Sequence, residues 1–347
     1  MRMGKLLRLL AVFVILAAVA LVGLVVQIKI WLQPVPVLAQ EPVLVSIPQG
    51  ASLIRIADIL AEHGLVRNAT VFRYYAKYRS LDQRLQAGDY ILHYGMTMDE
   101  ILQRLARGDV YRNTVTVTIP EGYNLEQIAA VLEAAGLVPA EEFLTAAAAV
   151  VPASGRVTEG QRYALEGYLF PDTYEFERGV SVEQIIARMQ NRLEEILTDE
   201  LRERAAELGL DLHTVITMAS LVEREGRVAG EFPLIASVIH NRLAKDMLLQ
   251  IDATVIYALG EHKQTVLLED LEVDSPYNTY KNKGLPPGPI ASPGKAAILA
   301  VLYPEESDYL YYVAKNDGSG EHYFGRTLAE HEANKRRARE NRKKQAE

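Results

Sequence analysis

A long uncharged run near the start of the chain dominates its hydrophobic pattern. Between Arg8 and Lys29 lie twenty residues without a charge, residues 9–28, rich in Leu, Val and Ala. An α-helix needs about 20 apolar residues to cross the hydrocarbon core of a bilayer. This run therefore predicts a transmembrane helix, and Trp31 just beyond it suits the membrane–water interface.

The charges around this run predict its orientation. Residues 1–8 carry three basic side chains, and basic flanks stay in the cytoplasm. We expect a cytoplasmic tip at residues 1–8, a single pass through the inner (plasma) membrane at 9–28, and the rest of the chain on the periplasmic or extracytoplasmic side. The alternative is a cleaved signal peptide with Val37-Leu38-Ala39 as its cleavage site, although the run exceeds the usual signal length of about 7–15 apolar residues.

A repeated pattern of strand and helix follows. Residues 45–66 read VSIPQGASLIRIADILAEHGLV, and residues 117–138, 72 positions later, read VTIPEGYNLEQIAAVLEAAGLV. In each copy a β-rich run and a Pro–Gly turn precede apolar residues spaced three and four apart, which line one helical face. These positions are Leu53, Ile56, Ala57 and Leu60 in the first copy and Leu125, Ile128, Ala129 and Leu132 in the second. The copies predict two β–α units with a domain boundary near residue 113.

The first unit, residues 45–112, continues beyond its repeat. Its pattern predicts a second helix at 69–77, a strand at 89–93 and a further helix at 98–107. The order strand–helix–helix–strand is typical of a LysM module, which binds N-acetylated glycans, and a generic α+β spacer is the alternative. Residues 29–44 hold three prolines and predict an extended linker.

The remainder, residues 113–334, is mainly helical in pattern. Helices are predicted at 124–135, 140–149, 181–206, 211–225, 231–245 and 293–302. A strand pair is predicted at Tyr309–Ala314 and Glu321–Phe324, around a turn at 316–318. Loops are predicted at 163–175 and at 274–294, which holds five prolines and three glycines. We therefore predict an α+β fold with an N-terminal transmembrane helix, a small LysM-like unit and a mostly helical domain around a small sheet.

Composition and charge restrict the class of protein. The chain has no cysteine, which excludes disulfides, a cysteine zinc site and a thiol nucleophile. Its net charge of −8 argues against nucleic acid as a partner. The tail, residues 335–347, is an exception with seven basic residues, which we interpret as the solvated end of a helix.

The sequence lacks several catalytic motifs, and this leaves carboxylate chemistry. There is no G-x-S-x-G elbow, and the histidines show no H-E-x-x-H or other close ligand spacing, so we expect neither a metal nor another cofactor. The best candidate is Glu223 in MASLVEREG, at the edge of a buried helical stripe and near the helix end. Burial and the helix dipole both raise the pKa of such a carboxyl, as a general acid requires. A surface ion pair of Glu223 with Arg227 remains open, and Glu225 is a competitor or a supporting partner.

Several ordered motifs resemble the MltG/YceG-like family of endolytic murein transglycosylases. They are SLVERE at 220–225, VIHNRL at 238–243, LQIDATVIY at 249–257, YNTY at 277–280, GLPPGPI at 284–290 and EGYLFPDTY at 166–174. One departure is Ala253, where the family pattern leads us to expect Pro or Ser. The single apolar span and the LysM-like unit fit the same family.

This resemblance implies a function and a set of site residues. The catalytic acid/base of the domain at 113–334 falls on Glu223. Gln250, Asp252, Tyr277 and Asn278 fall where the family lines its glycan groove. Further candidates for substrate contact are Glu166, Glu225 and His322, with structural roles open for Glu166, Tyr277 and His322.

The reaction implied is that of a lytic transglycosylase, a lyase acting on peptidoglycan. It would cleave the MurNAc–GlcNAc bond within nascent glycan strands, leave 1,6-anhydroMurNAc ends and limit strand length near the inner membrane, next to cell-wall synthases as partners. Two alternatives stay open, a membrane-anchored peptidoglycan hydrolase and a non-catalytic wall-binding scaffold.

Overall fold

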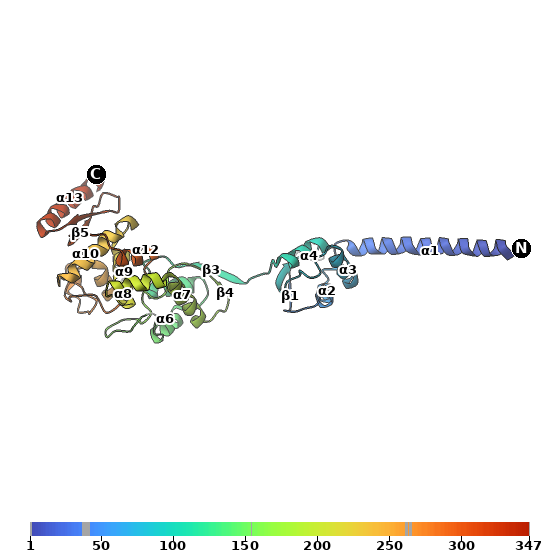
Figure 1. Ribbon diagram of the computed structural model, residues 1–347, viewed down its shortest axis with the longest axis horizontal. Coiled ribbons are helices and arrows are strands. Elements are labelled where there is room, and N and C mark those ends of the chain that lie inside the picture. Colours follow the sequence, from blue (N-terminus) through green and yellow to red (C-terminus); the bar gives the residue numbers. More distant parts are fainter. Residues whose placement is uncertain (1, 37–41, 154, 261–262, 264–265, 347) are drawn as a thin grey trace. The chain divides into compact units, whose positions relative to one another are not determined.

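The chain folds into two compact units, Met1–Asn113 (unit 1) and Thr114–Glu347 (unit 2) (Figure 1). The computed structural model describes residues 2–36, 42–153, 155–260, 263 and 266–346. The signal-cleavage alternative at 37–39 and residues 37–41 of the predicted linker lie outside the described residues.

The first helix, α1 (Arg2–Leu32), contains the apolar run. Its segment Leu10–Leu32 has the length and hydropathy of a membrane span, and none of its residues is buried in the described part of the protein. A membrane anchor and a signal sequence share these features. The helix extends through residues 2–8 and 29–32, beyond the predicted bounds of 9–28, because no helix-breaking proline occurs before Pro34.

The remainder of unit 1 is a small α+β structure. Its elements are β1 (Val43–Ile47), α2 (Leu53–Glu62), α3 (Ala69–Tyr78), β2 (Gly88–Leu92) and α4 (Met98–Arg107). The strands pair antiparallel, with Val45 opposite Tyr90. Side chains of Ser52, Asn68 and Thr97 cap the three helices after α1, which explains why these helices begin where they do. The elements occur where the sequence predicts them, and the likeness to LysM stays a prediction.

Unit 1 has its own core, to which the end of α1 is joined. Leu60, Tyr90 and Leu105 are fully buried in it, and Leu32 packs against it. Just before α3, the Arg67 guanidinium donates hydrogen bonds to the carbonyls of Gln33 and Pro34 at 3.4 and 3.1 Å. The residues after the apolar span are therefore held against this unit.

Unit 2 is helix-rich with two separate strand pairs. Its α-helices are α5 (Leu125–Ala134), α6 (Ala140–Ala149), α7 (Val182–Ile196), α8 (Asp199–Glu207), α9 (Leu212–Glu225), α10 (Phe232–Ala244), α11 (Asp252–Leu259), α12 (Lys295–Leu302) and α13 (Leu328–Ala346). The strand pairs are β3 (Thr114–Thr118) with β4 (Thr173–Glu177), and β5 (Tyr311–Ala314) with β6 (His322–Gly325). Two short 3₁₀ turns, η1 (Ala229–Glu231) and η2 (Asp270–Glu272), complete it.

Several predictions for unit 2 were wrong in detail. The helix predicted at 181–206 is two helices, because the chain leaves helical geometry at Leu197 and Thr198. Among the described residues of unit 2, two sheets replace the single predicted one, since β4 begins at the end of the predicted loop 163–175 and pairs with β3. By contrast, the tail predicted as the solvated end of a helix is, as far as residue 346, the largely exposed second half of α13, and α13 packs on β5 and β6.

The helix α9 is the centre of unit 2. Residues 215–222 of it are all buried, because α8, α10, α11 and α12 pack around it. Asp211 caps its start by accepting a hydrogen bond from the Thr214 amide at 2.8 Å. Its final residues, which carry the charged SLVERE motif, therefore project from a rigid support.

Each unit should respond separately to a cavity in its own core. Leu105→Ala in α4 removes a fully buried side chain of unit 1 and should lower the free energy of unfolding of that unit by about 2–5 kcal/mol. We expect hydrogen exchange, read by mass spectrometry, to accelerate in α2–α4 and to stay unchanged in α9. Leu125→Ala in unit 2 is the matched control with the reverse pattern. Equal acceleration in both units would contradict two separate cores.

Candidate active site

Three consecutive charged residues end α9 and point in different directions. Successive helical positions differ by about 100° around the axis, so Glu223, Arg224 and Glu225 face three neighbouring structures. Gly226 ends the helix, and the Phe232 ring lies where a Cβ at this position would be. The two glutamates therefore have separate surroundings.

Glu223 faces α12 and the turn of the second repeat copy. Its Oε2 accepts a hydrogen bond from the Gly294 amide at 3.0 Å, at the start of α12. Burial raises its pKa, the nearby Glu121 raises it further, and the Gly294 hydrogen bond opposes both. Its Cγ lies 3.6 Å from the position of a Cβ built on Gly122. Glu223 is thus a half-buried carboxyl packed against backbone.

Glu225 faces β5 and the start of α11. The Tyr312 hydroxyl donates a hydrogen bond to its Oε2 at 3.1 Å. Burial is the main cause that raises the pKa of Glu225 to about 7; Asp252 raises it as well, whereas the Tyr312 and Ala253 hydrogen bonds lower it. Around neutral pH, this carboxyl is therefore divided between its protonated and ionised forms.

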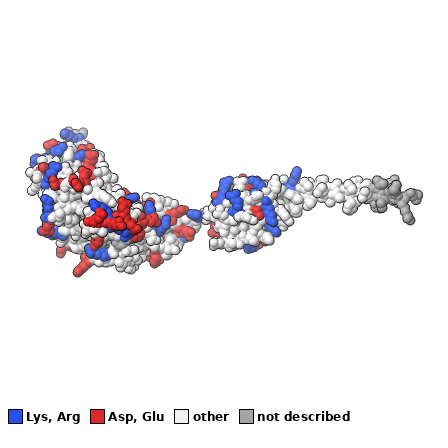
Figure 2. Space-filling model, in the orientation of Figure 1, with Lys and Arg blue, Asp and Glu red and all other residues white. Residues whose placement is uncertain are grey.

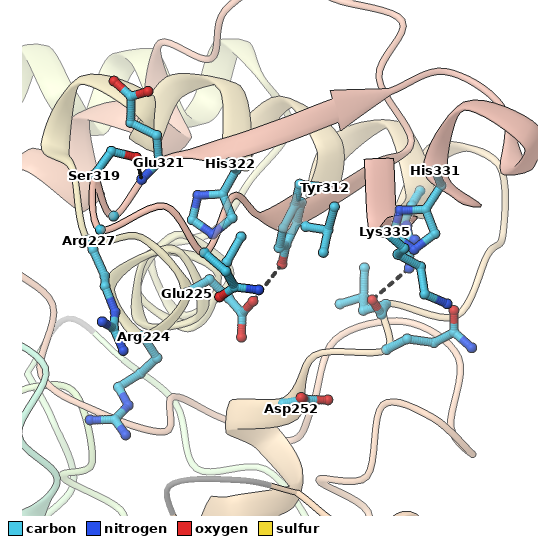
Figure 3. Close-up of a pocket in the computed structure, with 18 of the residues that line it drawn as sticks. Arg224, Glu225, Arg227, Asp252, Tyr312, Ser319, Glu321, His322, His331 and Lys335 are labelled. Carbon is cyan, nitrogen blue, oxygen red and sulfur yellow. Dashed lines mark hydrogen bonds between the residues drawn. The ribbon is translucent and has the colours of Figure 1, made fainter. Parts of the chain in front are cut away.

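Glu225 also lines a large cavity of about 1020 Å³ (Figure 3). Figure 3 shows the Glu225 carboxyl below Tyr312 and His322, with Asp252 beneath it. The cavity wall comes from the end of α9, from Leu249, Gln250 and Asp252, from the β5–β6 hairpin and from α13. Its polar lining and size suit a large polar ligand.

Four of the predicted site residues meet at this cavity. Gln250, Asp252, Glu225 and His322 all line it, and Glu223 does not. Gln250 is exposed with a φ of 52°, and Asp252 accepts a hydrogen bond from the Tyr280 hydroxyl.

Glu231 supports His322 from the side of η1. The Nδ1 of His322 lies 2.8 Å from Glu231 Oε2, and the backbone amide of His322 donates to the same carboxylate at 3.0 Å. The His322 ring packs edge-on against Tyr312, with ring centroids 5.6 Å apart. The imidazole is therefore fixed next to the tyrosine that holds Glu225.

The other predicted residues lie in the interior. Tyr277 is 3% exposed and packs on Tyr257. The Asn278 amide donates to the carbonyls of Leu271 and Val273 at 2.8 and 2.9 Å. Both side chains support the loop at 274–294 and are not among the residues that line the cavity.

Glu166 is a fully buried carboxyl. It accepts hydrogen bonds from the Leu125 amide at 3.1 Å and from the Tyr257 hydroxyl at 3.0 Å. Burial raises its pKa to about 8, against the lowering by these two hydrogen bonds. Glu166 therefore joins the start of α5 to α11 as a predominantly neutral group at neutral pH.

Two residues of the site did not come from the sequence as site residues, Tyr312 and Arg242. The Arg242 guanidinium is buried and donates to the carbonyls of Leu310, Leu248 and Leu249 at 2.6, 3.1 and 2.8 Å. It thereby ties α10 to β5 and to the segment before Gln250. The sequence signal for Arg242 was an arginine among the apolar residues of VIHNRL. An arginine buried there needs hydrogen-bond partners, since an unpaired guanidinium is costly inside a protein.

No metal site accompanies these groups in the part of the chain that the structure describes, where no three His, Asp or Glu side chains come together in a suitable cluster. The fold and the cavity together define a helix-rich α+β protein with a large, carboxyl-lined cavity.

The chain belongs to the YceG-like family, which its sequence matches over residues 45–337. A Bacillus subtilis protein named endolytic murein transglycosylase is 40% identical over 320 residues, covering 87% of this chain and 86% of the relative. A Streptococcus pneumoniae protein of the same name is 36% identical over 330 residues, covering 87% of this chain and 59% of the relative.

A solved structure supports the assignment of the chain to the YceG-like family. The crystal structure of a YceG-like protein from Listeria monocytogenes superposes with a TM-score of 0.57 at 40% sequence identity. The match covers 85% of this chain and 99% of the Listeria chain. The likeness therefore extends over most of both proteins.

The buried Glu166 should make unit 2 less stable as the pH rises. Its pKa in the folded chain is about 8, above the ordinary 4.5, so its contribution is fully present below pH 4.5 and is lost as the pH rises toward 8. We expect the free energy of unfolding to fall by up to about 1.4 kcal/mol per pH unit in this window. Glu166→Gln, which stays neutral, should flatten the slope in urea unfolding measured from pH 5 to 8.

The control for this experiment is Glu203→Gln, on the exposed side of α8. It should keep the wild-type slope. An unchanged slope in the Glu166 variant would show that this carboxyl is not held neutral by the fold.

Proposed function

We propose that this protein is an endolytic murein transglycosylase that cuts glycosidic bonds within peptidoglycan glycan strands. The observation that carries the proposal is the Glu225 carboxyl, with a pKa raised to about 7, in a cavity of about 1020 Å³. The name of the 40% identical relative supports the same substrate.

Glu225 is the better candidate for the acid, although the resemblance led us to expect Glu223. A general acid must reach its substrate, and Glu225 lines the cavity whereas Glu223 does not. Glu223 instead binds the start of α12 through the Gly294 amide. The role of Glu223 stays a prediction, which the variants below test against Glu225.

The reaction needs one group that first gives and then takes a proton. Protonated Glu225 donates its proton to the glycosidic oxygen as the bond to C1 of the N-acetylmuramic acid residue breaks. The Glu225 carboxylate then accepts the proton of the C6 hydroxyl of the same sugar, whose oxygen bonds to C1. The product is a 1,6-anhydro end, no water is consumed, and the enzyme returns to its protonated form.

Neighbouring groups suit the charge that develops in this step. The exposed carboxyl of Asp252 lines the same cavity and favours the positive oxocarbenium-like sugar. Gln250 and Tyr280 offer hydrogen bonds to sugar hydroxyls, and Tyr312 and the Ala253 amide stabilise Glu225 when it is ionised. Tyr277, Asn278 and Glu166 act from the interior by holding the loops that carry these groups.

The apolar helix α1 fits a membrane anchor for this enzyme. Three basic residues precede its span, so we propose a single pass through the inner membrane with the N-terminus in the cytoplasm and unit 2 outside. Nascent glycan strands emerge near that surface. Cutting there would limit strand length and would place the enzyme next to cell-wall synthases.

Paired variants distinguish the two glutamates. Glu225→Gln should lower the rate of strand cleavage by about 10²-fold or more, whereas Glu223→Gln should keep most of it. The measurement incubates residues 42–347 with purified sacculi and identifies the products by mass spectrometry. Lytic products should be about 18 Da lighter than hydrolytic ones, because water is not added.

Each other outcome has a defined meaning. Loss of cleavage only in the Glu223 variant would return the acid to Glu223. Products of hydrolytic mass would make the protein a peptidoglycan hydrolase. Bound but uncut strands with the wild-type protein would indicate a wall-binding scaffold.

The pH profile should report the protonation of Glu225. With a pKa of about 7, kcat/KM should be level below pH 7 and fall about tenfold per unit above it. Tyr312→Phe removes a hydrogen bond that lowers this pKa, so the falling limb should move to higher pH. Tyr323→Phe on β6, whose hydroxyl contacts Asn341, is the control. A limb unmoved in the Tyr312 variant would exclude Glu225 as the titrating acid.

A further inference from the structure

Unit 1 presents two tyrosines to solvent on one face of α3. Tyr74 and Tyr78 are 70% and 82% exposed and lie one helical turn apart. Phe72 and Ala76, on the opposite face, are fully buried in the core of the unit. The core thus explains the buried face of α3 and leaves Tyr74 and Tyr78 largely in solvent, where the Tyr78 ring contacts only the neighbouring Tyr75 ring, with centroids 6.3 Å apart, among the ring pairs of the described residues.

The helix α3 is held next to the end of the apolar span. It contacts α1 directly, and Arg67, two residues before α3, bonds to the carbonyls of Gln33 and Pro34. Leu32, the last residue of α1, packs on the core to which α3 belongs. If α1 crosses a bilayer, its end and Trp31 lie at the interface, and α3 lies next to it because the two helices are in contact.

The same helix carries positive charge without a negative one. Its sequence, ATVFRYYAKY, contains Arg73 and Lys77 and no acidic residue. Residues 43–113 as a whole hold nine Lys and Arg against seven Asp and Glu, in a protein whose net charge is −8. Figure 2 shows Lys and Arg gathered on the visible face of unit 1.

We propose that the exposed face of α3, formed by Thr70, Tyr74, Lys77 and Tyr78 with Arg73 at its edge, docks on the headgroup layer of an anionic lipid bilayer. Tyrosine suits this layer because its ring is apolar and its hydroxyl is polar. Basic residues near an anionic surface are attracted to its headgroups. The proposal rests on α1 being a membrane anchor, and it adds a second contact that fixes the tilt of unit 1 on the membrane.

The chain contains no cysteine, so a single spin label tests the proposal in the full-length protein. Thr70→Cys places a nitroxide on the proposed face and leaves both tyrosines intact. The protein is inserted in nanodiscs of equimolar phosphatidylglycerol and phosphatidylcholine, and collisions of the label with oxygen and with an aqueous nickel chelate are compared. We expect oxygen to be favoured, as in lipid headgroups, and the preference to fall severalfold in pure phosphatidylcholine.

Two variants and a control separate the contributions. Tyr74→Ser with Tyr78→Ser, and independently Arg73→Gln with Lys77→Gln, should each return the label toward aqueous accessibility. Tyr111→Ser removes another exposed tyrosine of unit 1, 43% exposed, and should leave the label unchanged. Strand cleavage measured on the same samples should persist in all of them, because none of these residues lies in unit 2.

Three outcomes would overturn the proposal. A label equally aqueous in both lipid mixtures would show that α3 does not touch the bilayer. A label protected by added glycan strands and not by lipid would make this face a glycan site. Protein that does not remain in nanodiscs at all would remove the anchor itself, while the cleavage assay would still report on the proposed enzyme activity.

Discussion

A carboxyl group kept partly out of water at the end of a buried helix is the constraint on which the site depends. Burial disfavours the charge on Glu225, and the structure limits this cost with the Tyr312 hydroxyl and the start of α11. For these donors to reach the same carboxyl, β5 and the start of α11 must be held at fixed positions relative to the end of α9. The packing of unit 2 therefore determines the protonation behaviour of the Glu225 carboxyl in its cavity.

The buried guanidinium of Arg242 helps to fix β5 and the segment before α11 around Glu225. Among the described residues, its hydrogen-bond partners are backbone carbonyls and not an acidic side chain. Its guanidinium donates hydrogen bonds to the carbonyls of Leu310, just before β5, and of Leu248 and Leu249. The Cζ atom of Arg242 lies 5.1 Å from the centroid of the Tyr311 ring. The arginine therefore positions the backbone on both sides of the cavity. The hydrogen bonds of Arg242 thus go to backbone carbonyls, whereas Glu225 and Asp252 accept hydrogen bonds from tyrosine hydroxyls.

Periodic segments were predictable from the sequence, and contacts between distant segments were not. The repeat and its apolar spacing located α2 and α5 because local spacing determines an amphipathic helix. The short helix α11 and the strand β4 were missed, since each is stabilised by pairing with residues far away in the chain. For the same reason the motif LVERE gave two glutamates a residue apart, and only Tyr312, 87 residues beyond Glu225, distinguishes the one that faces the cavity.

The two repeat copies use the same turn in different ways. Gly50, in the first copy, has open space around it, whereas Gly122, in the second, lies against Glu223 and Arg224, and its carbonyl accepts a hydrogen bond from Arg224 at 3.1 Å. In both copies the turn directly precedes the helix, α2 or α5. The same β–α pattern therefore ends in a solvent-facing turn in unit 1 and in a turn packed against the end of α9 in unit 2, so one local sequence pattern tolerates two different packing environments.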